Sequence, residues 1–333
     1  MALLEVKHLV TEFHTQDGIV HAVNDVSFSV DRGELVAIVG ESGCGKTVSS
    51  LSVMRLIPEP PGKIASGDIF FDGVDILRLP KEAMRKIRGC KMSMIFQEPM
   101  TSLNPVLTIG RQLTESLALH KGLKKKEAMA EAASLLQKVG IPQADKRLKS
   151  YPHHFSGGMR QRVMIAMAIS CQPKLIIADE PTTAVDVTIQ AQLLELLKGI
   201  VKDLDSALIL ITHNLGVVAR YAHRVYVMYA GRVVEYGTAV DIFHSPFHPY
   251  TVGLLGSVPR LDEPRKMRLR SIEGQPPDLI CPPNGCAFAA RCSYFVKGEC
   301  DVMSFKMVEM TPGHFTSCLV AIRGETPWQK TTS

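Results

Sequence analysis

Short apolar stretches recur along the chain, each bounded by polar residues or glycine. They span residues 34–39 (ELVAIV), 92–96 (MSMIF), 174–178 (KLIIA) and 207–212 (ALILIT). Runs this short and rich in Val, Ile and Leu are typical of strands buried in a parallel sheet. Helix-like segments occur at 48–54 and 163–170. This mixture of strands and helices predicts an α/β fold.

Length and composition narrow the class of protein. The chain has 333 residues, of which 46% are hydrophobic and 21% charged. This length suggests about two domains, and this composition excludes a disordered or collagen-like chain. The net charge of +5 is spread over a large surface. It is too small to indicate a nucleic-acid partner, and we expect none.

The apolar runs also bear on the membrane. The run from 207 to 211 is among the longest, and it is far shorter than the about 18 residues needed to span a bilayer. Near the start of the chain, Glu5 and Lys7 stand where a signal peptide would have its apolar stretch. We therefore expect a cytoplasmic chain that reaches a membrane only through partners.

The first apolar run leads into a glycine-rich segment, Gly40-Glu-Ser-Gly-Cys-Gly-Lys46-Thr47, and then into the first helix-like segment. This is the strand–turn–helix context of the phosphate-loop pattern G-x-x-x-x-G-K-S/T. Glycines let backbone N–H groups turn inward toward phosphate oxygens. Lys46 would then reach the β- and γ-phosphates, and the Thr47 hydroxyl would bind Mg²⁺. A plain surface loop is the alternative. The predicted ATP-binding residues are Ser42, Gly43, Cys44, Gly45, Lys46, Thr47 and Val48.

Two further apolar runs end in polar residues that suit phosphate chemistry. Asp179 and Glu180 follow the run at 174–178, and His213 follows the run at 207–212. Ligands bind at the carboxyl ends of parallel strands. We therefore expect Asp179 to bind Mg²⁺, Glu180 to polarise the attacking water as general base, and His213 to contact the γ-phosphate. The alternatives are a solvated turn for the two acids and a surface or core position for His213.

Cysteines are concentrated at the end of the chain. Five of the eight, Cys281, Cys286, Cys292, Cys300 and Cys318, fall within the last 53 residues. In a reducing compartment such a cluster is more often a metal site than a disulfide framework. Four thiolates suit an iron–sulfur cluster or tetrahedral zinc equally.

Motifs outside the phosphate loop and the acidic run indicate a family. They are Phe96-Gln97-Glu98-Pro99, Phe155-Ser156-Gly157-Gly158-Met159 and Ala184-Val185-Asp186. With these motifs, residues 1–240 resemble the ATP-binding subunits of ABC transporters. The resemblance implies an α/β P-loop nucleotide-binding domain, with a helical subdomain inserted at about 98–172. A Cys-rich C-terminal extension would then occupy 241–333.

The resemblance also implies roles for residues outside the phosphate loop. Gln97 would join Thr47 and Asp179 around Mg²⁺. The signature residues would bind, in trans, the γ-phosphate held by the opposite subunit, and Asp186 would belong to the D-loop. Phe13 would stack on adenine, with core packing as the alternative. The signature residues are Ser156, Gly157, Gly158 and Met159. Read physically, Ser156 could equally be an ordinary helix N-cap.

Three longer blocks narrow the resemblance to the dipeptide/oligopeptide importers, a branch that includes nickel importers. These blocks cover residues 97–105, 158–162 and 184–190, and His248-Pro249-Tyr250 matches a C-terminal motif of that branch. Physically, this motif is only a proline-marked entry into a helix. Two residues depart from the family: Asn214, where Asp is usual, and Met159, where Gln is commoner.

This branch implies an ATP hydrolase that energises peptide import. Its partners would be two transmembrane permease subunits, a second and different ABC ATPase subunit, and an extracytoplasmic substrate-binding protein. The chain would lie at the cytoplasmic face of the inner membrane, as a peripheral subunit. The alternatives are a nickel or other small-solute importer, a non-transport ABC ATPase, and a redox-sensing metal protein.

In this branch the cysteine pattern resembles an extension that carries a 4Fe-4S iron–sulfur cluster. The implied ligands are Cys286, Cys292, Cys300 and Cys318, with zinc or unmetallated thiols as alternatives, and Cys281 has no assigned role. The expected cofactors are ATP, Mg²⁺ and this cluster. The cluster would stabilise a tail with few apolar residues.

Overall fold

The computed structural model describes residues 2–182, 186–257, 272–302 and 306–328. The chain forms two compact units. The first contains Met1–Leu4, Val30–Glu34 and Phe71–Ile211, and the second contains Glu5–Ser29, Leu35–Phe70 and Thr212–Ser333. The D-loop positions 184 and 185 lie outside the described residues.

The first unit is built around three parallel strands. They are β6 (Met92–Ile95), β7 (Leu175–Asp179) and β8 (Ala207–Ile211), with β7 in the middle. Every residue of β7 and β8 is buried, as the short apolar runs predict. The register pairs Asp179 with Ile211, so β7 and β8 end at the same level.

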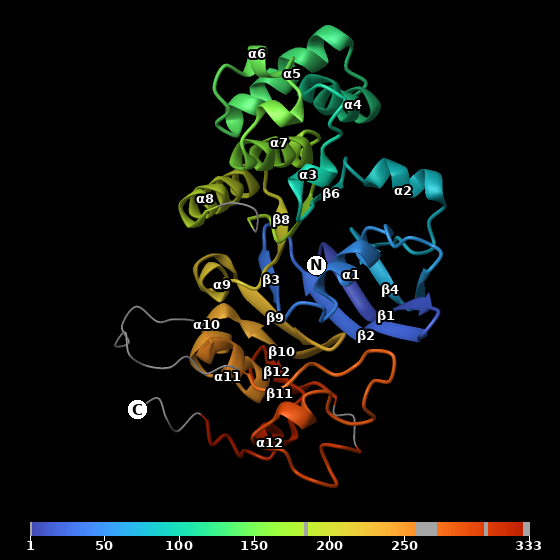
Figure 1. The fold of residues 1–333 in the computed structure, drawn as a ribbon, viewed down its shortest axis with the longest axis vertical. Coiled ribbons are helices and arrows are strands. Elements are labelled where there is room, and N and C mark those ends of the chain that lie inside the picture. The colour runs from blue at the N-terminus through green and yellow to red at the C-terminus, as the bar shows by residue number, and fades with distance from the viewer. Residues whose placement is uncertain (1, 183–185, 258–271, 303–305, 329–333) are drawn as a thin grey trace. The chain divides into compact units, whose positions relative to one another are not determined.

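Helices make up most of the remainder of this unit. They are α2 (Lys81–Ile87), α3 (Pro99–Ser102), α4 (Ile109–Lys121), α5 (Lys125–Lys138), α6 (Ala144–Arg147), α7 (Gly157–Ile169) and α8 (Val187–Asp203). Helices α4 to α7 gather into one bundle (Figure 1), where Leu113, Leu117 and Leu136 are fully buried. The unit also has the short strand β5 (Val74–Asp75) and the 3₁₀ turn η1 (Pro152–His154).

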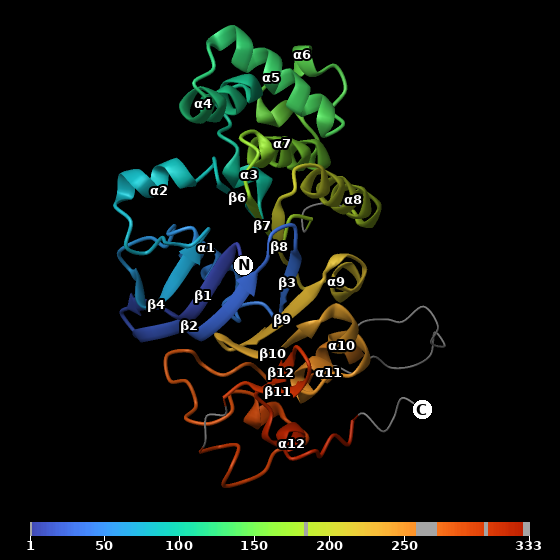
Figure 2. The same cartoon turned by 180° about the vertical axis from the view of Figure 1, so that it is seen from behind.

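The second unit contains two groups of strands. In one group, β2 (Gly18–Val30), β1 (Leu4–Thr15) and β4 (Gly62–Phe71) lie side by side in that order. In the other, β3 (Leu35–Val39) runs parallel to β9 (Arg224–Tyr229), and β9 pairs antiparallel with β10 (Arg232–Thr238). The tail adds β12 (His314–Thr316) and β11 (Val308–Thr311) beyond β10, as Figure 2 shows.

Short helices complete the second unit. They are α1 (Lys46–Val53), α9 (Leu215–Tyr221), α10 (Ala239–His244), α11 (Pro249–Gly256), α12 (Leu319–Ile322) and the 3₁₀ turn η2 (Ala289–Arg291). Three aromatic rings, Tyr229, Tyr250 and Phe288, pack together with centroids 4.6 to 5.4 Å apart. This contact joins β9, α11 and the tail in one core.

The end of the described chain is anchored by Trp328, the single tryptophan of the sequence. Its indole is buried, and its Nε1–H donates to the carbonyl of Pro246 at 2.9 Å. The ring also packs against Tyr294, with centroids 4.7 Å apart. These contacts fold the last described residues back onto the tail.

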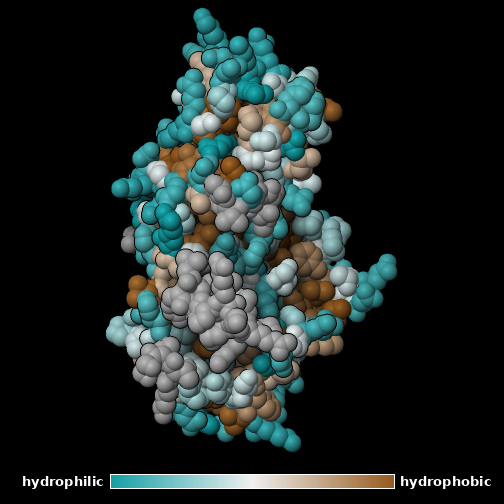
Figure 3. Space-filling view, turned by 60° about the vertical axis from the view of Figure 1, so that its left-hand side comes forward, coloured by the Kyte–Doolittle hydropathy of each residue, from teal (hydrophilic) through white to brown (hydrophobic). Residues whose placement is uncertain are grey.

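The helices and the hydropathy of the surface agree with the lack of long apolar runs in the sequence. None of the helices among the described residues has the length and apolar composition to cross a membrane. On the face drawn in Figure 3, hydrophilic residues predominate and apolar ones form small patches.

Candidate functional site

The phosphate loop is held in shape by glycines between β3 and α1. Gly45 has a φ of 101°, in the region that favours glycine. A Cβ at Gly45 would lie 2.4 Å from the carbonyl oxygen of Ala22, and a Cβ at Gly40 would lie 2.2 Å from that of Met228. Neither position can therefore carry a side chain without movement of the backbone.

Lys46 closes this loop. Its Nζ donates to the carbonyl oxygens of Gly40 and Glu41, both at 2.8 Å, and its side chain is buried. Within the described chain no side chain caps the start of α1. Backbone N–H groups at a helix start and a fixed ammonium together make an anion site. Ser42, Gly43 and Thr47 are exposed beside it, and Val48 is half-buried.

Cys44 lies within the loop but does not present a reactive thiolate. It is buried, and burial raises the pKa of its thiol, although the nearby Lys46 ammonium acts in the opposite direction. A protonated thiol at this position fills space in the core.

The acidic run places its two carboxylates differently. Asp179 is buried at the end of β7, whereas Glu180 is half-buried and adopts a φ of 42°. The Glu180 N–H donates to the carbonyl of Ile211 at 2.9 Å, which fixes this left-handed conformation. Such conformations are uncommon for residues other than glycine and are concentrated at functional sites.

Gln97 lies at the same end of this sheet. It is exposed just beyond β6, and its Nε2 donates to Oε2 of Glu180 at 3.2 Å. The structure therefore brings together the glutamine that the family resemblance singles out and the predicted general base. Gln97, Asp179 and Glu180 belong to the first unit, and Lys46 and His213 belong to the second.

His213 and Asn214 lie just after β8. His213 is exposed, and the Asn214 side chain accepts a hydrogen bond from the N–H of Val217 at 3.3 Å. Asn214 is thus the N-cap of α9, a role that Asn and Asp fill equally well. The departure from the family pattern at this position preserves the cap.

Phe13 is half-buried on β1. A Cβ at Gly62 of β4 would lie 3.0 Å from Cε1 of Phe13, so the ring lies against the neighbouring strand. The residue is neither fully buried nor exposed, so its position is compatible with core packing and with adenine stacking.

The signature residues start a helix, as the physical interpretation of Ser156 predicts. Ser156 is the N-cap of α7, and its hydroxyl accepts from the N–H of Met159 at 3.4 Å. It is exposed, and Gly157, Gly158 and Met159 are half-buried. Asp186 caps α8 in the same way, accepting from the N–H of Ile189 at 3.0 Å.

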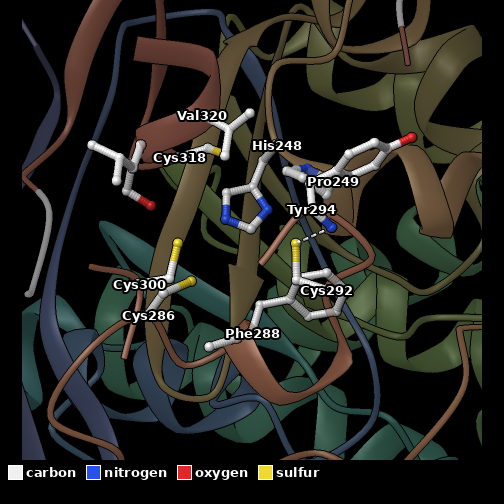
Figure 4. Close-up of a pocket in the computed structure, with 12 residues that line it drawn as sticks. His248, Pro249, Cys286, Phe288, Cys292, Tyr294, Cys300, Cys318 and Val320 are labelled. Carbon is white, nitrogen blue, oxygen red and sulfur yellow. Dashed lines mark hydrogen bonds between the residues drawn. The ribbon is translucent and has the colours of Figure 1, made fainter. Parts of the chain in front are cut away.

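The four expected cysteine ligands line a single pocket in the tail (Figure 4). They are Cys286, Cys292, Cys300 and Cys318. The N–H of Cys286 donates to the carbonyl of Cys300 at 2.7 Å, which holds two ligand-bearing segments together. Nowhere in the described ranges do three His, Cys, Asp or Glu side chains approach closely enough to hold a metal ion. Cys281 is exposed.

Burial keeps three thiols of this pocket protonated. It raises the pKa of Cys286, that of Cys292 to about 11 and that of Cys318 to about 12. A bound cation would reverse this effect, because metal ions favour thiolates.

His248 also faces this pocket, which the sequence motif alone did not indicate. Its ring is fully buried, and burial lowers its pKa to about 3, so it is neutral. Nδ1 accepts from the N–H of Tyr250 at 3.1 Å, which assigns the proton to Nε2. This Nε2–H has no partner among the described residues, and Figure 4 shows the ring among the four cysteines. Pro249 does begin α11, as predicted.

Comparisons with known proteins match two regions of the chain to family models. Residues 23–183 match the ABC transporter family model, and residues 234–300 match the oligopeptide/dipeptide transporter C-terminal region. The dipeptide transport ATP-binding protein DppD of Bacillus subtilis is 58% identical over 290 residues, which cover 87% of this chain and 86% of DppD. The oligopeptide transport ATP-binding protein OppD of Escherichia coli is 50% identical over 317 residues, covering 95% and 93%.

Solved structures agree with this assignment of fold. The dimeric ATP-binding cassette MJ0796 bound to ADP and Pi superposes with a TM-score of 0.64 at 25% identity. The match covers 71% of this chain and 98% of that cassette. The predicted α/β cassette with a helical subdomain is therefore confirmed.

Proposed function

Because this chain belongs to the ATP-binding subunits of ABC transporters, in the group with the oligopeptide/dipeptide C-terminal region, we propose that it hydrolyses ATP to energise the import of dipeptides or oligopeptides. One observation carries the proposal. The glycine loop and the bound Lys46 ammonium form an anion cradle at the start of α1. Relatives named for dipeptide and oligopeptide transport supply the class of cargo.

Each polar residue of the site has a role in this scheme. Lys46 and the loop N–H groups would bind the β- and γ-phosphates, and Thr47, Asp179 and Gln97 would hold Mg²⁺. Mg²⁺ held by these residues would neutralise the charge that develops on the phosphate oxygens. Glu180 polarises the attacking water and His213 contacts the γ-phosphate. The hydrogen bond from Gln97 to Glu180 supports this scheme, because it orients the carboxylate that would accept the proton.

The signature residues act on a second ATPase subunit. Ser156 presents an exposed hydroxyl at the start of α7, where N–H groups and the helix dipole favour a phosphate. ATP would be enclosed between two subunits, as the dimeric form of the similar cassette MJ0796 suggests. The second subunit is a different ATPase chain in our proposal, and the pair binds two permease subunits at the cytoplasmic face of the membrane. A binding protein on the other side delivers peptide.

In our proposal the tail, from about residue 241, would hold a 4Fe-4S cluster through Cys286, Cys292, Cys300 and Cys318. Four sulfurs around one pocket support this ligand set, and so does the unpartnered N–H of His248, which can donate to a sulfur. A zinc ion needs all four sulfurs about 2.3 Å from one centre. An iron–sulfur cluster is larger than a single metal ion, so its cysteine ligands would be spaced more widely than those of zinc. When bound, it would supply folding energy to the tail.

Uptake measurements test the proposed cargo. Cells that lack this chain and require an external dipeptide for growth should grow when given the wild-type chain and fail with Glu180→Gln. Uptake of labelled dipeptide, of a longer peptide and of nickel should be measured in parallel. Nickel uptake that depends on the chain, without peptide uptake, would contradict the proposal.

A further inference from the structure

Glu41, the second residue of the phosphate loop, is bound by the C-terminal tail. Its two carboxylate oxygens accept from the guanidinium of Arg291, at 2.7 Å from Nη1 and 3.0 Å from Nη2. The arginine side chain is 4% exposed and the glutamate 27%. A two-pronged pair of this kind fixes orientation as well as distance.

Tyr250 holds the backbone of the same residue. The N–H of Glu41 donates to the Tyr250 hydroxyl at 2.8 Å, and the carbonyl of Glu41 accepts from Lys46 at 2.8 Å. All polar groups of Glu41 are therefore engaged. Two of the three contacts come from residues that follow the cassette core in sequence, and the third leads to the phosphate-binding lysine.

Arg291 is itself rigidly placed. Its Nε donates to the carbonyl of Glu273 at 3.0 Å, and its Nη1 donates to the Tyr229 hydroxyl at 3.3 Å. Its guanidinium also lies over the rings of Tyr229 and Phe288. Such contacts favour a planar guanidinium over an ammonium. Arg291 directly precedes Cys292, and Phe288 lines the cysteine pocket.

We propose that Arg291 is a positioning residue of the nucleotide site, which acts through Glu41 and with Tyr250 to hold the phosphate loop in its binding shape. The inference rests on the proposed ATPase function and extends it: the tail is a support of the phosphate loop. A loop already in its bound shape loses less entropy when ATP binds. Without Arg291 the loop must be ordered at that moment, so ATP affinity falls while the chemistry of bound ATP changes little.

The test uses the full chain and MgATP. Arg291→Met should raise the Kd for ATP about tenfold, within the usual range for coupled sites. In the assembled transporter, kcat should fall less than threefold. Arg291→Lys keeps the positive charge but cannot donate to both carboxylate oxygens as a guanidinium does, so it should restore ATP affinity only in part. Arg323→Met is the matched control, because Arg323 pairs with Glu299 within the same tail, and it should bind ATP like wild type.

Glu41→Gln tests the same pair from the loop side and leaves the tail unaltered. It should also weaken ATP binding. The double variant with Arg291→Met should bind ATP with the same affinity as whichever single variant binds less tightly, because both changes break one interaction. Thermal unfolding of each variant reports whether the tail has folded. If Arg291→Met fails to fold, Glu41→Gln alone decides the question.

Two outcomes separate this inference from the function on which it rests. A wild-type chain that fails to bind ATP would contradict both. Wild-type affinity in the Glu41 variant, or a loss confined to kcat, would overturn the positioning role and leave the ATPase assignment intact.

Discussion

The phosphate loop and the cysteine pocket are two proposed binding sites built on opposite principles. The loop occupies consecutive residues, Gly40 to Thr47, and would bind phosphate through backbone N–H groups whose directions are set by glycine φ angles and by α1. The pocket takes its four sulfurs from positions spread between Cys286 and Cys318, in a tail with little regular structure. A backbone site is encoded locally, whereas a side-chain site requires the tail to be folded first.

This difference also concerns what holds each site in place. The loop follows β3, in which every residue is buried, so its support is the cassette core. The core of the tail is small, with Cys318, Val320, Ala321 and Trp328 as its buried members at one end. We expect ligands at the cysteines to stabilise the tail, and ligands at the loop to leave global stability less affected.

The largest expected effect is on the rate of ATP hydrolysis, with ATP binding unchanged. Glu180→Gln removes the predicted general base, so ATP turnover should fall by about 10² to 10⁴. ATP binding and the visible absorbance of the tail should be unchanged, because neither depends on this carboxylate. Turnover assays and titration with a fluorescent ATP analogue measure the two effects. Turnover close to wild type would remove Glu180 from its assigned role.

The second effect concerns the tail. If the tail carries the proposed cluster, Cys286→Ser should remove its iron and lower the free energy of unfolding by at least about 3 kcal/mol, since ligation contributes directly to folding. Iron and sulfide analysis and urea unfolding measure the two quantities. Cys281→Ser is the control, because Cys281 is exposed. A wild-type chain that carries zinc and no iron would contradict the proposed iron–sulfur cluster. It would still agree with the four cysteines as metal ligands.

A third test distorts the phosphate loop and should leave the tail intact. Gly45→Ala introduces a Cβ that meets the carbonyl of Ala22 at a φ of 101°, with strain of about 1–3 kcal/mol. ATP affinity should fall about tenfold or more, without loss of iron. Gly43→Ala is the matched comparison, since a Cβ there would meet nothing within 4 Å and should do less harm. Equal affinities in the two variants would show that steric contact at Gly45 does not shape the loop.

The smallest effect separates capping from ligand binding at Ser156. Ser156→Ala should lower the free energy of unfolding by about 1 kcal/mol through loss of the α7 cap. Ser156→Gly should lower it by only a few tenths of a kcal/mol. Both variants lose the hydroxyl, so both should reduce turnover of the assembled transporter to the same extent. If turnover follows stability instead, the serine is only a cap.

Much of the cassette could be predicted because its information is local. The apolar runs gave the strands, and the glycine loop gave the start of the helix, which begins at Lys46, close to the predicted residue 48. Helix α7 begins earlier than the predicted residue 163, at Gly157, because Ser156 caps it.

The contacts of the tail could not be predicted, because they join distant positions. Arg291 and Glu41 are 250 residues apart, and neither belongs to a pattern that indicates the other. His248 and Tyr250 stand in a recognisable motif, yet their separate tasks depend on the fold. One faces the cysteines and the other binds the phosphate loop.

Trp328 offers an intrinsic optical probe. It is the only indole in the chain, so the fluorescence originates at the tail alone. Its ring meets the ring of Tyr294, two residues from Cys292, edge to face. Iron bound among the neighbouring sulfurs would quench that emission, so filling and emptying of the pocket can be followed in real time without any label.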